Sequence, residues 1–254
     1  MDDVNKKISG VSVILPTLNE AGNIASLIQC TVAAIQNAGI DEIEIIVVDD
    51  DSSDRTWEVA SQVVCPPALV QVIRRMENHG LTASLTTGIK ASRHNVIVWL
   101  DCDFSHPPER IPQMLYMLDQ GFDVAVNSRY VLGGGEDRVG KGGAIQMFLS
   151  LILSWFVRFL LDASFTDYTS GFIAVRREVL QELPLRGDYG EYFVDFIYRA
   201  LRKKYRVCEL PYMAMPRRSG ESKTGTNLLQ YLRRGRKYVG TIINLRIGTL
   251  TGRL

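Results

Sequence analysis

Short apolar runs alternate with longer helical segments through the first hundred residues of the chain. The runs lie at residues 11–15, 43–48, 70–74 and 96–100, and polar residues follow them. Between the runs, apolar residues recur at helical spacing, most clearly over 24–35 and again over 80–91. Strands too continuously apolar to face water, separated by helices, are typical of a parallel sheet covered on both faces. The sequence therefore predicts an α/β fold with a mainly parallel central sheet flanked by helices. The length of 254 residues, 46% of them hydrophobic, suits one main domain.

Three of the predicted strands run directly into polar or acidic residues. These strand ends read Pro-Thr-Leu-Asn-Glu at 16–20, Asp-Asp-Asp at 49–51 and Asp-Cys-Asp at 101–103. In open parallel sheets, ligands bind beyond the carboxyl ends of the strands, so the three ends are expected to form one site. The chain contains neither GxGxxG nor GxxxxGK[ST], the common glycine-rich phosphate cradles. A bound diphosphate therefore needs a metal ion to neutralise it.

The two carboxylates of Asp101 and Asp103 are separated by one residue at a strand end. Mg²⁺ and Mn²⁺ prefer such oxygen ligands and share their remaining positions with phosphate and water. The alternative is that one of the two side chains caps the helix expected near Pro107. Asp50 is a candidate for a base or ribose contact, and its alternative is an Asx-turn that closes the strand.

Two segments in the second half of the chain indicate contact with lipid or phosphate. Residues 144–161 are the most apolar stretch, but polar residues interrupt it, so it is expected to be either a core helix or an interfacial helix in a membrane surface. Residues 202–254 carry 13 Lys and Arg against two Glu. This charge fits either a solvated face or a surface for phosphate groups and anionic lipid. Nucleic acid is not expected, since no nucleic-acid-binding motif accompanies the charge.

The four cysteines and the amino terminus both indicate a reducing, cytosolic environment. The cysteines are far apart and fit no zinc or redox spacing, so isolated thiols are expected. The first ten residues lack the apolar run of a secretory signal. The protein is therefore expected to be cytosolic or to face the cytosol. Together with the apolar and basic segments above, this favours a peripheral position on the cytosolic face of a membrane.

Six sequence blocks resemble the polyprenol-phosphate (dolichol-phosphate) mannosyltransferases of GT-A glycosyltransferase family two. The blocks are VILPTLNE at 13–20, IIVVDDDSSD at 45–54, DCDFSHPPE at 101–109, NSRY at 127–130, DYTSGF at 167–172 and RRSGESK at 217–223. The resemblance implies inverting transfer of mannose from GDP-mannose to a polyprenyl or dolichyl phosphate, with Mg²⁺ or Mn²⁺ as cofactor. UDP-glucose or another UDP-sugar is the alternative donor. The resemblance also leaves room for a small membrane-anchoring partner subunit.

The resemblance implies a role for individual residues at matching positions. Those implied at the nucleotide are Pro16, Leu18, Glu20, Val48, Asp50, Asp101 and Cys102. Asp103 is implied as the principal metal ligand, with Asp101 beside it. Those implied to act on the phosphates of donor or acceptor are Arg129, Arg138, Arg217 and Lys223. Those implied at the floor of the sugar and acceptor site are Asp167, Ser170 and Gly171.

Three positions depart from the family pattern. Leu18 stands where an aromatic residue is usual, Asp51 where Asn is usual, and Ser105 where a glutamine near the metal is common. The departures bear on nucleotide preference and leave the reaction class unchanged. The expected division is a catalytic domain at 1–227 and a basic amphipathic tail at 228–254. A distant alternative, a phospho-receiver signalling domain with acidic residues at 49–51, leaves the last half of the chain unexplained.

Overall fold

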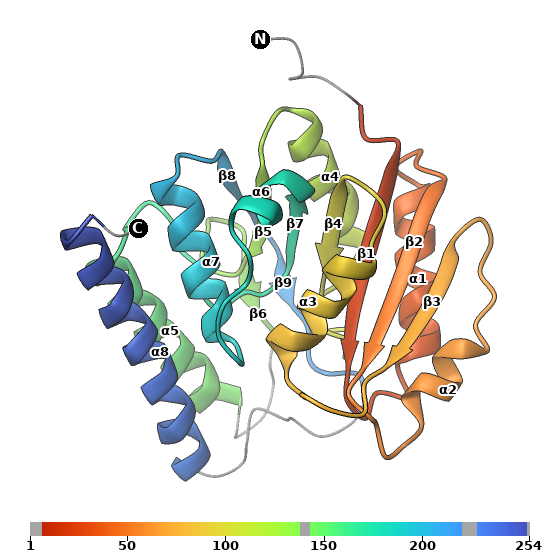
Figure 1. Ribbon diagram of the computed structural model, residues 1–254, viewed down its shortest axis with the longest axis horizontal. Coiled ribbons are helices and arrows are strands. Elements are labelled where there is room, and N and C mark those ends of the chain that lie inside the picture. Colours follow the sequence, from red (N-terminus) through yellow and green to blue (C-terminus); the bar gives the residue numbers. More distant parts are fainter. Residues whose placement is uncertain (1–6, 138–142, 220–227, 253–254) are drawn as a thin grey trace.

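A seven-stranded sheet forms the centre of the molecule, in the strand order β3-β2-β1-β4-β7-β5-β8. The computed structural model describes residues 7–137, 143–219 and 228–252 (Figure 1). Strand β7 is antiparallel to both of its neighbours, and all other neighbouring pairs of this sheet are parallel. The prediction of a mainly parallel sheet flanked by helices is confirmed.

Strands and helices alternate along most of the chain. The strands are β1 (Gly10–Thr17), β2 (Glu42–Asp49), β3 (Leu69–Arg74), β4 (Val96–Trp99), β5 (Val124–Ser128), β6 (Gly135–Glu136), β7 (Ile173–Arg176), β8 (Val207–Pro211) and β9 (Met213–Ala214). The helices are α1 (Ile24–Gln36), α2 (Thr56–Ser61), α3 (Leu81–Ala91), the short 3₁₀ turn η1 (Pro108–Arg110), α4 (Ile111–Asp119), α5 (Gly143–Leu160), α6 (Arg177–Glu182), α7 (Glu191–Arg202) and α8 (Leu228–Leu250). Strands β6 and β9 pair in a separate small sheet.

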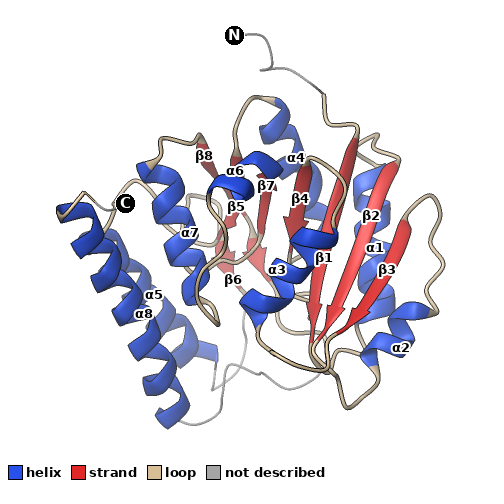
Figure 2. Cartoon of the chain, viewed as in Figure 1, coloured by secondary structure: helices blue, strands red, loops and turns tan. Residues whose placement is uncertain are grey.

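Helices cover both faces of the central sheet (Figure 2). One face packs against α1, α2 and α4, and its apolar cluster includes Ile28 and Leu115. The other face packs against α3, α6 and α7, with Leu85 and Phe196 in its cluster. Strands buried on both faces explain why their sequences are continuous apolar runs without alternation.

Strand β1 is longer than its apolar run suggested. The run was expected to stop at Pro16, whereas β1 continues through Pro16 to Thr17. Pro16 is aligned with Val48 on the β2 side, while the pairing with β4 ends at Ile14. The missing N–H of the proline therefore leaves no gap in the ladder.

Helices α5 and α8 lie side by side as an outer layer beyond α7 (Figure 1). Both begin at the end of the molecule to which β1, β2 and β3 point (Figure 1). On α5, Val157 is buried whereas Trp155 and Phe159 are 66% and 76% exposed. Of the two alternatives for this segment, the plain core helix is therefore wrong, because one side of α5 presents aromatic rings to the outside. None of the helices is long and apolar enough to cross a membrane, as far as the described residues go.

Candidate active site

Hydrogen bonds tie the carboxyl ends of neighbouring strands into one edge. The backbone N–H of Asp50 donates to the carbonyl of Thr17 at 3.0 Å, and the Thr17 hydroxyl donates to Asp49 at 2.8 Å. On the other side of β1, the Cys102 thiol donates to the carbonyl of Pro16 at 3.4 Å. The predicted convergence of the three polar strand ends is confirmed. All four cysteines are free, as expected.

Asp50 is held by groups from the end of β3 and the start of α3. Its Oδ1 accepts from Arg75 at 2.6 Å and from the Ser84 hydroxyl at 2.7 Å, and its Oδ2 accepts from the N–H of Gly80 at 2.6 Å. Gly80 has a φ of 136°, which favours glycine there. Asp50 therefore anchors the loop that follows β3, and a contact with a base or ribose stays a prediction.

The turn after β2 is closed by the residue before Asp50. Asp49 Oδ1 accepts from the N–H of Ser52 at 2.8 Å, and Asp49 Oδ2 accepts from the Ser52 hydroxyl at 2.6 Å. Asp49 therefore closes the turn after β2 through a contact three residues on, and the contacts of Asp50 do not form the Asx-turn considered for it. Val48, implied at the nucleotide, has a completely buried side chain that belongs to the core, whereas Leu18 is exposed at the edge.

A strap, which we define as residues 213–219, crosses the ends of β1 and β4 and places Arg217 between two carboxylates. One guanidinium nitrogen of Arg217 lies 2.9 Å from Glu20 Oε1, and the other lies 2.8 Å from Asp103 Oδ2. Both carboxyl side chains are buried, while the Arg217 side chain is 25% exposed. The structure thus brings together three of the residues implied at the donor.

The carboxyl group of Asp103 is ionised in spite of its burial. Burial alone would raise its pKa, but the charge of Arg217 and the hydrogen bonds from Ser105 outweigh burial and hold the pKa below the usual 3.8. The N–H of Ser105 donates to Asp103 Oδ1 at 2.9 Å. Ser105 therefore supports the carboxylate it follows. Neither Asp101 nor Asp103 caps η1 or α4, so that alternative is wrong.

His106 belongs to the site, although the three histidines of the chain are too scattered in the sequence to predict a cluster. It is buried, its ring stacks on Phe172 with centroids 5.0 Å apart, and Nδ1 accepts from the N–H of Asp101 at 3.0 Å. The contact fixes the backbone at the first residue of the Asp-Cys-Asp triplet. It also requires the neutral ring to carry its proton on Nε2.

The donor set at the end of β4 fits a divalent cation that takes its other ligands from phosphate. Asp103 offers an ionised carboxylate that already pairs with a cation, and Asp101 is exposed two residues earlier. Such oxygen ligands suit Mg²⁺ and Mn²⁺, which share their coordination with phosphate and water. Within the described ranges, no group of three or more His, Cys, Asp or Glu side chains gathers as a metal site by itself.

Arg129 lies at the same edge of the sheet, at the end of β5, and is held from several sides. It donates to both oxygens of Asp167 at 2.7 and 2.8 Å, to Glu136 at 2.6 Å and to Thr169 at 2.7 Å. Asp167 is completely buried; burial would raise its pKa, but the Arg129 charge and hydrogen bonds hold the pKa below 3.8. In the structure, the Arg129 guanidinium bonds to side chains of the chain itself. A contact between Arg129 and a phosphate stays a prediction.

The loop before β7 contains the other residues implied at the floor of the site. The Ser170 hydroxyl donates to the carbonyl of Asn127 at 2.5 Å, and Gly171 has a φ of 73°. A Cβ at Gly171 would be strained by that backbone conformation. Glu209 on β8 accepts from the N–H groups of Thr166 and Asp167 at 2.7 and 3.0 Å. The loop is therefore built on β5 and β8, and its role toward a ligand stays a prediction.

Two of the implied phosphate ligands, Arg138 and Lys223, lie outside the described residues. Two residues that sequence reasoning missed, Arg75 and His106, lie in the candidate site at the carboxyl edge of the sheet. The signal for Arg75 was available: it directly follows the third predicted strand, at the same sheet edge where the other strands carry acids. His106 had no such signal, because its ring partner Phe172 lies far away in the sequence.

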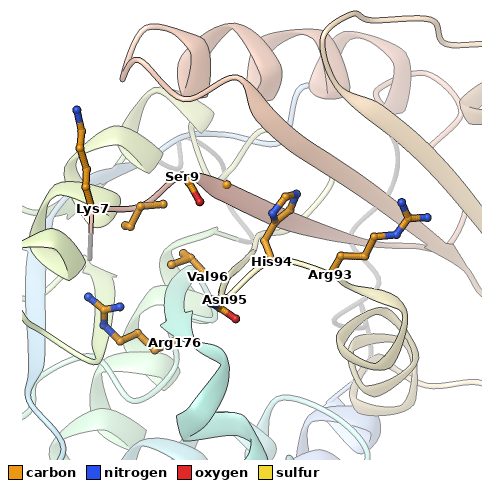
Figure 3. Close-up of a pocket in the computed structure, with 9 residues that line it drawn as sticks. Lys7, Ser9, Arg93, His94, Asn95, Val96 and Arg176 are labelled. Atoms are coloured by element: carbon orange, nitrogen blue, oxygen red, sulfur yellow. The ribbon is translucent and has the colours of Figure 1, made fainter. Parts of the chain in front are cut away.

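A separate cavity of about 170 Å³ lies at the opposite, amino end of β1 and β4 (Figure 3). Lys7, Arg93, His94 and Arg176 contribute to its lining. Their charged groups spread apart and do not converge on one point (Figure 3). The ligand site of an open parallel sheet lies at the other end of the strands.

Solved structures and the sheet order together define the class of the protein as a GT-A nucleotide-diphospho-sugar transferase fold. The crystal structure of glucosyl-3-phosphoglycerate synthase from Mycobacterium tuberculosis, in complex with Mn²⁺, UDP-glucose and phosphoglyceric acid, matches 94% of this chain and 80% of its own, with a TM-score of 0.70 and 20% identity. The chain belongs to glycosyl transferase family 2, whose sequence profile matches residues 12–184.

Two curated relatives extend the similarity beyond that profile. A dolichol-phosphate mannosyltransferase from Pyrococcus furiosus is 36% identical over 88% of this chain, which spans 62% of the relative's length. A polyprenol monophosphomannose synthase from Mycolicibacterium smegmatis is 34% identical over 85% of this chain and 82% of its own.

Proposed function

We propose that the protein transfers mannose from GDP-mannose to a polyprenyl or dolichyl phosphate, with inversion at the anomeric carbon. The observation that carries the proposal is the bridge from Glu20 through Arg217 to Asp103, which gathers acidic and basic groups beyond the ends of β1 and β4. Such an edge suits a diphosphate and its cation. The names of both curated relatives point to mannose and a lipid phosphate.

The donor side of the reaction requires stabilisation of a departing nucleoside diphosphate. Asp103, with Asp101, would hold the Mg²⁺ or Mn²⁺, which supplies positive charge to the diphosphate. Arg217 lies within reach of the same carboxylate and is proposed to contact the diphosphate directly. Lys223 is proposed to join it from outside the described residues. Fixed charges aimed at developing negative charge provide much of an enzyme's rate enhancement.

The acceptor side requires positioning more than proton transfer. A lipid monophosphate is anionic at neutral pH, so its oxygen can attack the anomeric carbon without a strong general base. Arg129 is proposed to fix the floor formed by Asp167, Ser170 and Gly171 and, with Arg138, to orient the acceptor phosphate. Four of the guanidinium hydrogen bonds of Arg129 are internal, so its share in this step is mainly to shape the site.

The prenyl chain of the acceptor needs a lipid environment, which the outer layer of α5 and α8 is proposed to meet. The exposed apolar side chains there are Leu151, Ile152, Trp155, Phe156 and Phe159 on α5 and Val239, Ile243, Ile247 and Leu250 on α8. The exposed Arg236 and Arg246 on α8 suit anionic headgroups. We propose peripheral attachment at the cytosolic face of a membrane, with the start of both helices near the active edge.

A donor and acceptor screen tests the proposed function. Purified protein would be incubated with Mg²⁺ or Mn²⁺, polyprenyl phosphate in detergent, and radiolabelled GDP-mannose, UDP-glucose or other UDP-sugars. We expect label from GDP-mannose in the lipid phase and an inverted, β-linked product. Transfer from a UDP-sugar alone would replace the donor assignment. Transfer only to a water-soluble acceptor would contradict the lipid assignment.

A further inference from the structure

The strap is fastened on both sides of Arg217 by contacts that do not involve its guanidinium. On one side, the N–H of Met215 donates to the carbonyl of Ser105 at 3.2 Å. On the other, the Ser219 hydroxyl donates to Asn23 Oδ1 at 2.6 Å. The N–H of Arg218 also donates to the carbonyl of Asp103 at 3.0 Å. The backbone of the strap therefore stays close to the acidic edge even if the Arg217 side chain moves.

The Arg217 guanidinium occupies the position between two carboxylates, where a cation is attracted most strongly. It lies 2.9 Å from Glu20 and 2.8 Å from Asp103. Both carboxylates are buried, so little water screens their charges from each other. Asn23 also donates to Glu20 Oε2 at 2.8 Å, and the N–H of Ser105 donates to Asp103 Oδ1. The oxygen of Asp103 that faces Arg217 is therefore the one that a metal ion would need.

We propose that Arg217 is a built-in, displaceable counter-ion of the metal position. It competes with a bare divalent cation for Asp103, so the cation binds the free protein weakly and binds firmly only together with a nucleoside diphosphate. The inference rests on the proposed function for the identity of the ligand and deepens it, because it states the order in which charges enter the site.

The charges explain why the diphosphate relieves the competition. A divalent cation placed beside Arg217 adds two positive charges next to a third, at a site with two carboxylates. A nucleoside diphosphate brings negative charge with the cation, and its oxygens give the guanidinium a second set of partners, to which arginine is well suited. Arg217 can then leave Asp103 without losing an anionic partner. The 25% exposure of its side chain leaves it room to turn.

Arg218 provides a matched control in the same strap. Its side chain carries the same charge as Arg217, but its guanidinium lies over the Phe104 ring, 5.0 Å from the centroid. Only its backbone N–H reaches Asp103. Loss of the Arg218 charge therefore tests the general effect of one fewer positive group near the site.

The test measures Mn²⁺ binding by titration calorimetry and by the electron paramagnetic resonance signal of free Mn²⁺, with and without GDP. Arg217→Gln is expected to bind Mn²⁺ alone about tenfold more tightly than the wild type, and to lose most of the enhancement that GDP gives. Arg218→Gln is expected to change Mn²⁺ binding less than twofold, roughly the effect of a screened surface charge. Arg217→Lys, which keeps the charge, is expected to restore the weak binding of Mn²⁺ alone, and thermal unfolding checks that each variant is folded.

Unchanged Mn²⁺ affinity in folded Arg217→Gln, or an equal gain in Arg218→Gln, would overturn the proposal. So would the absence of Mn²⁺ binding in wild type and variant alike. Because no sugar or lipid takes part, these outcomes are separate from the failure of mannosyl transfer. A protein that moves no mannose but shows the expected Mn²⁺ and GDP coupling would retain the counter-ion role and lose only the proposed reaction.

Discussion

Two arginine clusters at the same edge of the sheet each join two carboxylates, but their surroundings differ. Arg129 has a side chain only 6% exposed and donates to Asp167, Glu136 and Thr169. Arg217 is 25% exposed and makes one contact with each of its two carboxylate partners. A buried arginine with several hydrogen bonds is part of the structural framework of the site. A partly exposed arginine with one contact to each partner can exchange partners. The comparison separates the residues that build the site from those that act in it.

The largest effect is expected where the framework cluster loses its carboxylate. Asp167→Ala leaves the Arg129 charge buried and only partly paired, which costs about 3–5 kcal/mol. For a chain of this size, that loss lowers the melting temperature by about 10 °C. Differential scanning calorimetry measures the shift. Glu58→Ala, which breaks the exposed Arg55 pair at 2.5 Å, is the control and should cost under about 1 kcal/mol. A melting temperature of Asp167→Ala equal to that of the control would break the comparison.

The pH dependence of stability gives a second view of the framework cluster. The folded-state pKa of Asp167 lies below 3.8, so its stabilisation is complete above the unfolded value and is lost as the pH falls through the folded value. The stability difference between wild type and Asp167→Asn should therefore be largest near about pH 6 and shrink toward about pH 3, by at most about 1.4 kcal/mol per pH unit. Urea unfolding at several pH values measures it. A difference that grows on acidification would contradict the assignment.

A smaller loss of stability is expected from the exchangeable cluster. Arg217→Gln removes a half-open partner from Glu20 and Asp103, whose other hydrogen bonds remain. We expect a loss of about 1–2 kcal/mol, less than half of that in Asp167→Ala, because water reaches the site and screens the charges. Urea unfolding of the two variants side by side measures the ratio. Equal losses would mean that both arginines belong to the framework.

The least effect on stability is expected where neither cluster is touched. Trp155→Ser on α5 should leave the free energy of unfolding within about 0.5 kcal/mol, because the ring is 66% exposed. Binding to vesicles that contain anionic lipid should weaken about tenfold, since the ring no longer enters the interface. Sedimentation with vesicles measures binding. Tyr116→Ser, which removes a ring 62% exposed on α4, is the control. Equal binding by both variants would argue against the α5 surface.

The strand ends show how far the sequence alone could predict the site. Continuous apolar runs followed by acids located the ends of β1, β2 and β4, because a buried parallel strand must be apolar and its polar residues must begin where it emerges. The prediction that the first strand stops at Pro16 was wrong, because β1 continues to Thr17. The proline is tolerated there because the pairing of β1 with β4 has already ended at Ile14, so its missing N–H leaves no partner unpaired. Local sequence patterns predict whether a segment is a strand or a helix, whereas the position of its last residue depends on the strands that pair with it.

The partners of the charged residues could not be predicted in the same way. The sequence implied a phosphate contact for Arg129 and for Arg217 alike. Their difference depends on Asp167 and Glu20, which lie 38 and 197 residues from the arginine that each one contacts. His106 could not be predicted for the same reason, because its burial against Phe172 arises only when β4 and β7 pair. Tertiary packing, which no local pattern encodes, decides whether a charge is structural or available to a ligand.

The most direct test of the central claim is the rate of mannosyl transfer by Asp103→Asn beside the wild type. Both proteins would receive radiolabelled GDP-mannose, polyprenyl phosphate and Mg²⁺, and thermal unfolding would confirm that the variant is folded. Loss of the carboxylate that holds the cation should lower the rate by about 10²–10³-fold with little change in melting temperature. A folded Asp103→Asn that transfers mannose at a near-normal rate would contradict the account.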